Sequence, residues 1–169
     1  MLLYNPTFDA KHCAYRFLSV LHLSNGRSFQ WEAFKLIDLY RLYPTLLPTI
    51  KPFPRELSRV KKLLKSWPKQ YTIPSDPRKT LYQIQPIHNL VANWLIAKGF
   101  LSKERFESGI VTRTELNTPE GLLDLFAQDT VINSKWFQAF IEDLPNAAFE
   151  GPSGLKQRTG YMEFRYDPR

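Results

Sequence analysis

The stretch AKGFLSKERFESGIVTRTEL, residues 97–116, decides how the chain can fold. It begins at the end of a long amphipathic pattern, and Gly99 follows Lys98 where a helix C-terminal cap is expected. Phe100 and Leu101 come next as a short apolar pair. After a polar turn, side chains alternate in GIVTRTEL, residues 109–116, which weakly indicates a β-strand. A helix that runs into a small hairpin is the outline of a winged-helix unit, so we expect a mainly α, helical and winged-helix-like fold with a small β component.

Helical patterns surround this stretch on both sides. Apolar residues at helical spacing predict helices over residues 8–23, 29–42, 55–67, 78–98, 119–131 and 135–144. Pro86 is expected to kink or split the fourth helix, and Thr118 with Pro119 predicts the cap and first turn of the fifth. The prolines of residues 44–54 predict a shaped connector that packs on the core. We expect one compact domain over residues 1–169, with possible sub-units at 1–50 (helical) and 51–169 (winged-helix-like with a C-terminal tail).

Composition excludes several classes of protein. Of the 169 residues, 43% are hydrophobic and 14% aromatic, which is enough for a core and argues against disorder. No apolar run approaches the roughly 18 residues that span a bilayer. The N-terminal residues lack the pattern of a secretory signal, and Cys13, the single cysteine, cannot form an internal disulfide. A soluble cytoplasmic protein is therefore expected.

The net charge of +7 is concentrated in one segment. Residues 51–80 hold nine Lys or Arg against two acids, whereas the charges of the two flanking segments cancel. Leu57, Val60, Leu64 and Trp67 form a predicted buried stripe on the 55–67 helix. The cations form a predicted face toward DNA or an acidic partner: Arg55, Arg59, Lys62, Lys65 and Lys69. A merely solvated helix face is the alternative.

No catalytic constellation is found in the sequence. GPSGLK, residues 151–156, has the wrong spacing for a phosphate loop, and no Ser or Thr follows its lysine. His12 and Cys13 are adjacent on a helix and point about 100° apart, so we expect a surface His beside a buried Cys. His22 and His88 have no neighbouring ligand at metal spacing, and His88 is interpreted as a core histidine with a backbone partner. We expect no catalytic, cofactor-binding or metal-binding residue, and hence not an enzyme.

The C-terminal segment EGPSGLKQRTGYMEFRYD, residues 150–167, combines three glycines with a strand-like alternation. Glycine permits positive φ, so we predict a tightly turned docking loop followed by a strand that pairs with GIVTRTEL. The strand would place Met162, Phe164 and Tyr166 on the core side; an ordinary hairpin with solvated cations is the alternative. Arg16 is expected in an interaction or a structural ion pair. The predicted partner-binding residues are Gly151, Gly154, Leu155, Lys156, Arg158, Thr159 and Arg16.

Three stretches in order carry a resemblance to a known family: YNPTFDAKHCAYRFLSVL (4–21), KLIDLYRLYPTLLPTI (35–50) and GPSGLKQRTGYMEFRYD (151–167). The chain resembles the small middle components of bacterial ABC-three-component systems, of which Lamassu-type phage defence is the best-known group. The resemblance implies a non-catalytic adaptor between an SMC- or Rad50-like ABC ATPase and an effector, often a nuclease, with possible non-specific DNA contact in the complex. It implies that the docking loop meets the ATPase or the effector.

Two other functions stay open from the residues alone. One is a free-standing winged-helix regulator that binds DNA through the basic segment, although no helix offers a convincing set of Arg, Asn and Gln for base edges. The other is an unrecognised hydrolase, for which a catalytic constellation is missing.

Overall fold

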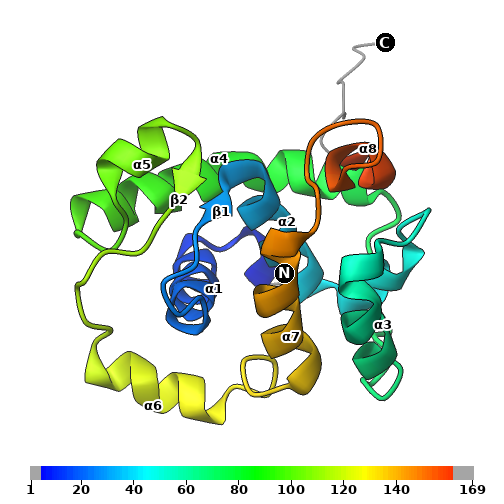
Figure 1. The fold of residues 1–169 in the computed structure, drawn as a ribbon. Coiled ribbons are helices and arrows are strands. Elements are labelled where there is room, and N and C mark those ends of the chain that lie inside the picture. Colours follow the sequence, from blue (N-terminus) through cyan, green and yellow to red (C-terminus); the bar gives the residue numbers. More distant parts are fainter. Residues whose placement is uncertain (1–4, 162–169) are drawn as a thin grey trace.

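The computed structural model describes residues 5–161, and Figure 1 shows a mainly helical molecule with a small two-stranded sheet to one side. The elements, with η for a 3-10 helix, are η1 (Pro6–Phe8), α1 (Ala10–Leu23), β1 (Phe29–Gln30), α2 (Trp31–Leu42), η2 (Pro44–Thr49), η3 (Arg55–Leu57), α3 (Ser58–Leu64), α4 (Pro77–Ala97), α5 (Lys103–Glu107), β2 (Ile110–Val111), α6 (Glu120–Gln128), α7 (Lys135–Asp143), η4 (Leu144–Asn146) and α8 (Leu155–Thr159). The expected mainly α fold with a small β component is confirmed.

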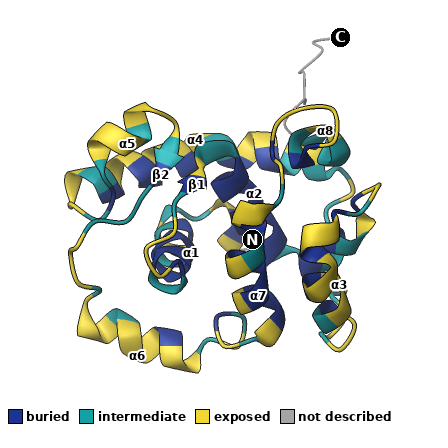
Figure 2. Cartoon of the chain, in the orientation of Figure 1, coloured by how far each residue is buried: buried dark blue, intermediate teal, exposed yellow. Residues whose placement is uncertain are grey.

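Helix α2 lies in the interior, with α1, α4 and η2 packed against it. Every residue from Ala33 to Arg41 is buried, and the ribbon of α2 is dark blue along this part of its length (Figure 2). A helix that is apolar on all sides suits such a position. This one also buries Lys35, Asp38 and Arg41, and buried charges require partners. These three side chains therefore need hydrogen-bonding or oppositely charged partners in the protein interior.

The small sheet joins segments that are far apart in the chain. β1 pairs antiparallel with β2, with Phe29 opposite Val111 and Gln30 opposite Ile110. The pairing continues where the amide of Trp31 donates to the carbonyl of Gly109, 2.8 Å away. Because Phe29 and Val111 are both buried, the sheet closes one side of the core.

The opposite edge of the β2 segment pairs with the residues that follow α4. Ser102 donates its amide to the Thr112 carbonyl at 3.0 Å, and Thr114 donates to the Phe100 carbonyl at 3.1 Å. Backbone groups of alternate residues point to opposite edges of a strand, so residues 109–114 lie between β1 and residues 100–102. The predicted run from helix to hairpin is confirmed, but the expected polar turn contains the short helix α5.

Other helix ends differ from expectation. Pro86 does not split α4, which is continuous from Pro77 to Ala97. The predicted cap at Thr118 is wrong: Pro119 occupies the N-cap of α6, and the Thr118 hydroxyl instead accepts a hydrogen bond from Arg113 at 3.2 Å. The predicted 55–67 helix is shorter, with η3 before it and turns after Leu64.

The connector of residues 44–54 packs on the core as predicted, with Leu47 and Pro54 both buried. The predicted C-terminal strand lies, from residue 162 onward, outside the described residues, as do Met162, Phe164 and Tyr166. Among described residues β2 has β1 as its partner strand. Of the helices within residues 5–161, none is long and apolar enough to cross a bilayer.

Candidate partner-binding surfaces and a buried polar cluster

Residues 151–160, expected to form a docking loop, make a tight turn into the short helix α8. Gly151 has φ +86° and Gly160 caps α8 with φ +62°, as the glycine argument predicted. Gly154 differs, because its φ is −76°. A Cβ at Gly154 would lie 2.2 Å from the Phe149 carbonyl oxygen, so this glycine is needed for close approach of backbone to backbone.

Several contacts hold α8 to the rest of the molecule. Leu155 is 3% exposed and belongs to the core, and its amide donates to the Ala148 carbonyl at 2.9 Å. The Arg158 guanidinium donates to the carbonyls of Ser153 and Pro52, the latter at 2.8 Å. The segment is therefore fixed in place, and Leu155 and Arg158 are engaged within the chain.

Other residues of the predicted docking loop remain accessible. Gly151 is exposed and Thr159 is half-buried. The Lys156 ammonium lies 3.5 Å from Glu150, with side chains 44% and 60% exposed. Solvent screening leaves such a pair little stabilising energy, so both side chains can turn toward a partner.

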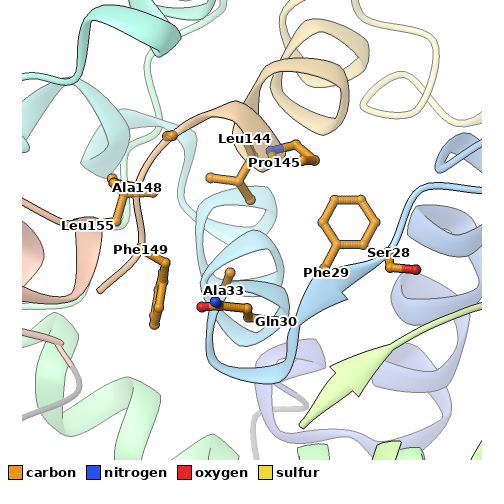
Figure 3. A pocket seen from close by; sticks show the side chains of 10 residues that line it. Ser28, Phe29, Gln30, Ala33, Leu144, Pro145, Ala148, Phe149 and Leu155 are labelled. Atoms are coloured by element: carbon orange, nitrogen blue, oxygen red, sulfur yellow. The ribbon is translucent and has the colours of Figure 1, made fainter. Parts of the chain in front are cut away.

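A cavity of about 260 Å³ lies under this segment. Figure 3 shows Phe149 on one side, Phe29 on the other and Ala33 between them. No titratable side chain lines it, so the Ser28 hydroxyl in its wall has no acid or base of the lining beside it. Its lining residues are Ser28, Phe29, Gln30, Ala33, Leu144, Pro145, Ala147, Ala148, Phe149 and Leu155.

The five cations predicted to face DNA or an acidic partner fall into two groups in the structure. Leu57, Val60 and Leu64 are buried as predicted, whereas Trp67 is only half-buried beside Trp136. Arg59 differs from the other cations, since its guanidinium donates to Asp143 and Glu142, each at 2.8 Å. These bonds join α3 to the end of α7. Arg59 is therefore engaged by acidic residues of its own chain. Of the other predicted cations of this face, Arg55, Lys62, Lys65 and Lys69 are exposed and form no ion pair within residues 5–161.

A buried ion pair links α1 to α2. The Nη2 of Arg16 donates to the Oδ2 of Asp38 at 3.0 Å, and its Nε donates to Oδ1. Arg16 is 5% exposed, so of the two roles considered for it the structural ion pair is confirmed. Burial alone would raise the pKa of Asp38, but the charge of Arg16 and hydrogen bonds from His88 and Arg16 outweigh it and hold that pKa well below its usual range.

His88 completes this cluster from α4. Its Nε2 lies 2.9 Å from the same Oδ2 of Asp38. His88 is a core residue as expected, but the predicted backbone partner is wrong, because the carboxylate takes that place. The other ring nitrogen, Nδ1, is buried without a protein partner among the described residues.

Cys13 brings a thiol to the cluster, and His12 beside it is exposed, as predicted. Ligand atoms of Cys13, Asp38 and His88 lie within 4.8 Å of one another, a grouping that could hold a metal ion. Arg16, however, occupies both carboxylate oxygens and would place its positive charge beside the metal. Burial, followed by the charge of Asp38, raises the pKa of the Cys13 thiol well above its ordinary value. A protonated thiol and a fixed guanidinium favour an ion-pair cluster over a metal centre.

A second polar network fixes the segment after α6. Asp129 Oδ2 accepts from the Arg41 guanidinium at 2.8 Å and from the Tyr15 hydroxyl at 2.9 Å. Arg41 also donates to the hydroxyl of Ser19. Burial raises the pKa of Tyr15 to about 12, and its hydrogen bond to Asp129 acts in the same direction. The sequence analysis missed this network, since nothing local connects Arg41 with a carboxylate 88 residues away.

An apolar groove of about 560 Å³ lies where α1, α4 and α6 meet. Leu90 and Trp94 of α4 line it and are 61% and 45% exposed. Exposed apolar surface of this kind often marks a contact with another molecule. The sequence analysis missed the groove too, because it considered only the inward face of this helix. The lining residues are Ala10, Lys11, Ala14, Tyr15, Leu18, Leu90, Val91, Trp94 and Leu122.

Comparison with protein families gives one match that covers nearly the whole chain. A family model described as "ABC-three component (ABC-3C) system Middle Component 5" matches residues 2–167. Comparisons with curated proteins and with solved structures each returned no match.

Proposed function

The chain belongs to the middle component 5 family of ABC-three-component systems, and from this premise we propose that it is a non-catalytic assembly and regulatory subunit. It links an SMC- or Rad50-like ABC ATPase to an effector nuclease in defence against phages or plasmids, as in Lamassu-type systems. The observation that carries the proposal is the family match over residues 2–167. In this proposal the described residues form one domain that carries more than one binding surface.

The α8 segment supports a docking role. The contacts of Leu155 and Arg158 hold its backbone in one conformation before any partner arrives. A surface that is already ordered loses less entropy on binding than a mobile one. Gly151, Lys156 and Thr159 are the accessible residues that would meet the ATPase or the effector.

Co-purification tests the proposal. The chain is expressed with the ATPase and the effector of its own system, and a tag on the ATPase is used to recover all three. Lys156→Glu should weaken recovery of at least one partner, because it reverses charge at the proposed contact. Deleting residues 151–158 is a poorer test, since it removes Leu155 from the core and the bonds of Arg158 to Ser153 and Pro52.

Lys103→Glu on α5 is the matched control. Lys103 lies 3.8 Å from Glu107 with side chains 75% and 67% exposed, a pair comparable to Lys156 and Glu150. The control should leave recovery and phage protection unchanged. Recovery of the tagged ATPase without this chain, under conditions where the ATPase and effector are folded, would contradict the proposal.

A free-standing winged-helix DNA regulator is a second candidate, and the order of elements favours it. The order α1, β1, α2, α4, residues 100–102 and β2, with β2 between the other two segments, is that of a winged-helix unit with residues 43–76 inserted. Against it, α4 exposes Leu90 and Trp94, which suit an apolar partner better than phosphate. Sequence-specific duplex binding by the purified chain, without co-purification of an ATPase, would favour this candidate over the adaptor.

A further inference from the structure

Four cations in and around α3 are exposed, whereas the apolar stripe is buried. Leu57, Val60 and Leu64 face the core, whereas Lys62 and Lys65 are exposed on the last turn. Arg55 precedes the helix and Lys69 follows it, and both are exposed. We call Arg55, Lys62, Lys65 and Lys69 the basic face. Within residues 5–161 these four side chains form no ion pair, so their charge is available to a ligand.

Nearby acids do not cancel this charge. Glu142 and Asp143, at the end of α7 where α3 packs, are engaged by Arg59. Arg59 therefore offsets one of the two negative charges beside α3, and the four cations of the basic face outnumber the acids that remain there. Glu56 is the remaining acid in the helix and its preceding turn.

An exposed aromatic residue follows Lys69 two positions along the chain. Tyr71 has a relative exposure of 105%, and the structure gives its ring no hydrogen bond or ring contact among residues 5–161. The segment that carries it is nevertheless anchored: the side-chain amide of Gln70 donates to the Leu42 carbonyl at 2.7 Å and Gln70 accepts from Thr45. Gln70 thus ties this segment to the body of the protein, and its neighbours Lys69 and Tyr71 are exposed.

We propose that the basic face and Tyr71 form a binding site for single-stranded nucleic acid, in which the four cations contact phosphates and the Tyr71 ring stacks on a base. A positively charged surface combined with an exposed aromatic ring is the arrangement that binds single strands without sequence preference. None of these five residues belongs to α8 or to α4.

Fluorescence anisotropy of the purified full-length chain tests the proposal. The probes are a labelled oligothymidylate of about 20 nucleotides, a duplex of equal length, and polyglutamate as a competitor. Four phosphate contacts predict a slope of about −3 in a plot of log binding constant against log salt concentration between roughly 50 and 200 mM. The double variant Lys62→Gln/Lys65→Gln should reduce the magnitude of this slope by about 1.4.

Substitutions at Tyr71 separate the contribution of base stacking to binding from that of charge. Tyr71→Ala should weaken oligothymidylate binding by about tenfold without changing the salt slope, whereas Tyr71→Phe should retain binding. Lys98→Gln/Lys103→Gln removes two exposed cations elsewhere and is the matched control. It should leave the affinity and the slope unchanged.

Four outcomes would overturn the proposal. The first three are absence of oligothymidylate binding at roughly 50 mM salt, equal loss in the Lys62/Lys65 variant and in its control, and displacement of the oligonucleotide by polyglutamate at equal charge concentration. The last would identify an acidic protein surface as the ligand. Tight duplex binding that the Tyr71→Ala substitution leaves unchanged would also contradict the proposal. Adaptor function is tested separately, because recovery of the ATPase and effector does not depend on these probes.

Discussion

Arg16 and Asp38 meet inside the protein through a two-pronged ion pair, in which Nη2 lies 3.0 Å from Oδ2 and Nε donates to Oδ1. Both residues are almost fully buried, at 5% and 2% exposure. His88 shares the same carboxylate from α4, so one aspartate connects three helices. Buried charges of this kind are costly to bring together and still more costly to leave unpaired.

Removing one member of this pair should therefore destabilise the fold strongly. Asp38→Asn leaves the Arg16 guanidinium buried without its counter-charge, and we expect a loss of about 3–5 kcal/mol in the free energy of unfolding. Urea unfolding followed by tryptophan fluorescence measures it. Glu142→Gln, in the exposed pair with Arg59, is the control and should cost less than about 1 kcal/mol. Similar losses in the two variants would contradict the structural role given to Asp38.

Stability should also depend on acid through Asp38. Its folded-state pKa lies below the ordinary value of 3.8, so the stability it contributes is present above that value and is lost as the pH falls below it toward the folded pKa. Unfolding measured from neutral pH to below pH 3.8 should show a steeper decline in the natural protein than in Asp38→Asn. Parallel declines would mean that other carboxylates carry the acid sensitivity.

Cys13 should be chemically inert in the folded protein. Its side chain is 0% exposed and burial raises the pKa of the thiol, so little thiolate exists to react. A disulfide reagent should label no thiol under native conditions and one per chain in urea. Cys13→Ser should reduce stability modestly and leave complex formation intact. Loss of phage protection by a folded Cys13→Ser protein that still forms the complex would challenge the non-catalytic proposal.

Two glycines of the α8 turn should respond differently to alanine. Gly154→Ala places a Cβ 2.2 Å from a backbone oxygen that cannot move away alone, and should cost about 2–4 kcal/mol. Gly151→Ala has open space but a φ of +86°, and should cost about 1–2 kcal/mol. Gly121→Ala in α6 is the control, neutral or stabilising by up to about 1 kcal/mol. Thermal unfolding of the three variants gives the ranking, and equal effects at Gly151 and Gly154 would refute the close-contact argument.

Local sequence patterns were sufficient to predict the main helices, a helix cap and a buried stripe of this protein. The spacing of apolar residues located the main helices, Gly99 has the positive φ expected of a helix cap, and Leu57, Val60 and Leu64 are buried as their stripe predicted. These features depend on neighbours within one or two helical turns, so sequence periodicity carries them. The charge excess of residues 51–80 was likewise visible, because it is a matter of composition.

Tertiary structure alone decided which side chains meet. Arg59 looks like any other cation of its helix, and only the packing of α3 on α7 brings it to Glu142 and Asp143. Asp38 contacts Arg16 and His88 across 22 and 50 residues, separations at which helical periodicity contains no information about register or facing. The same holds for Gly154, whose constraint is a carbonyl oxygen and not its own φ. A helix's sequence specifies its faces, whereas the partner of each face is set by how the helices pack together.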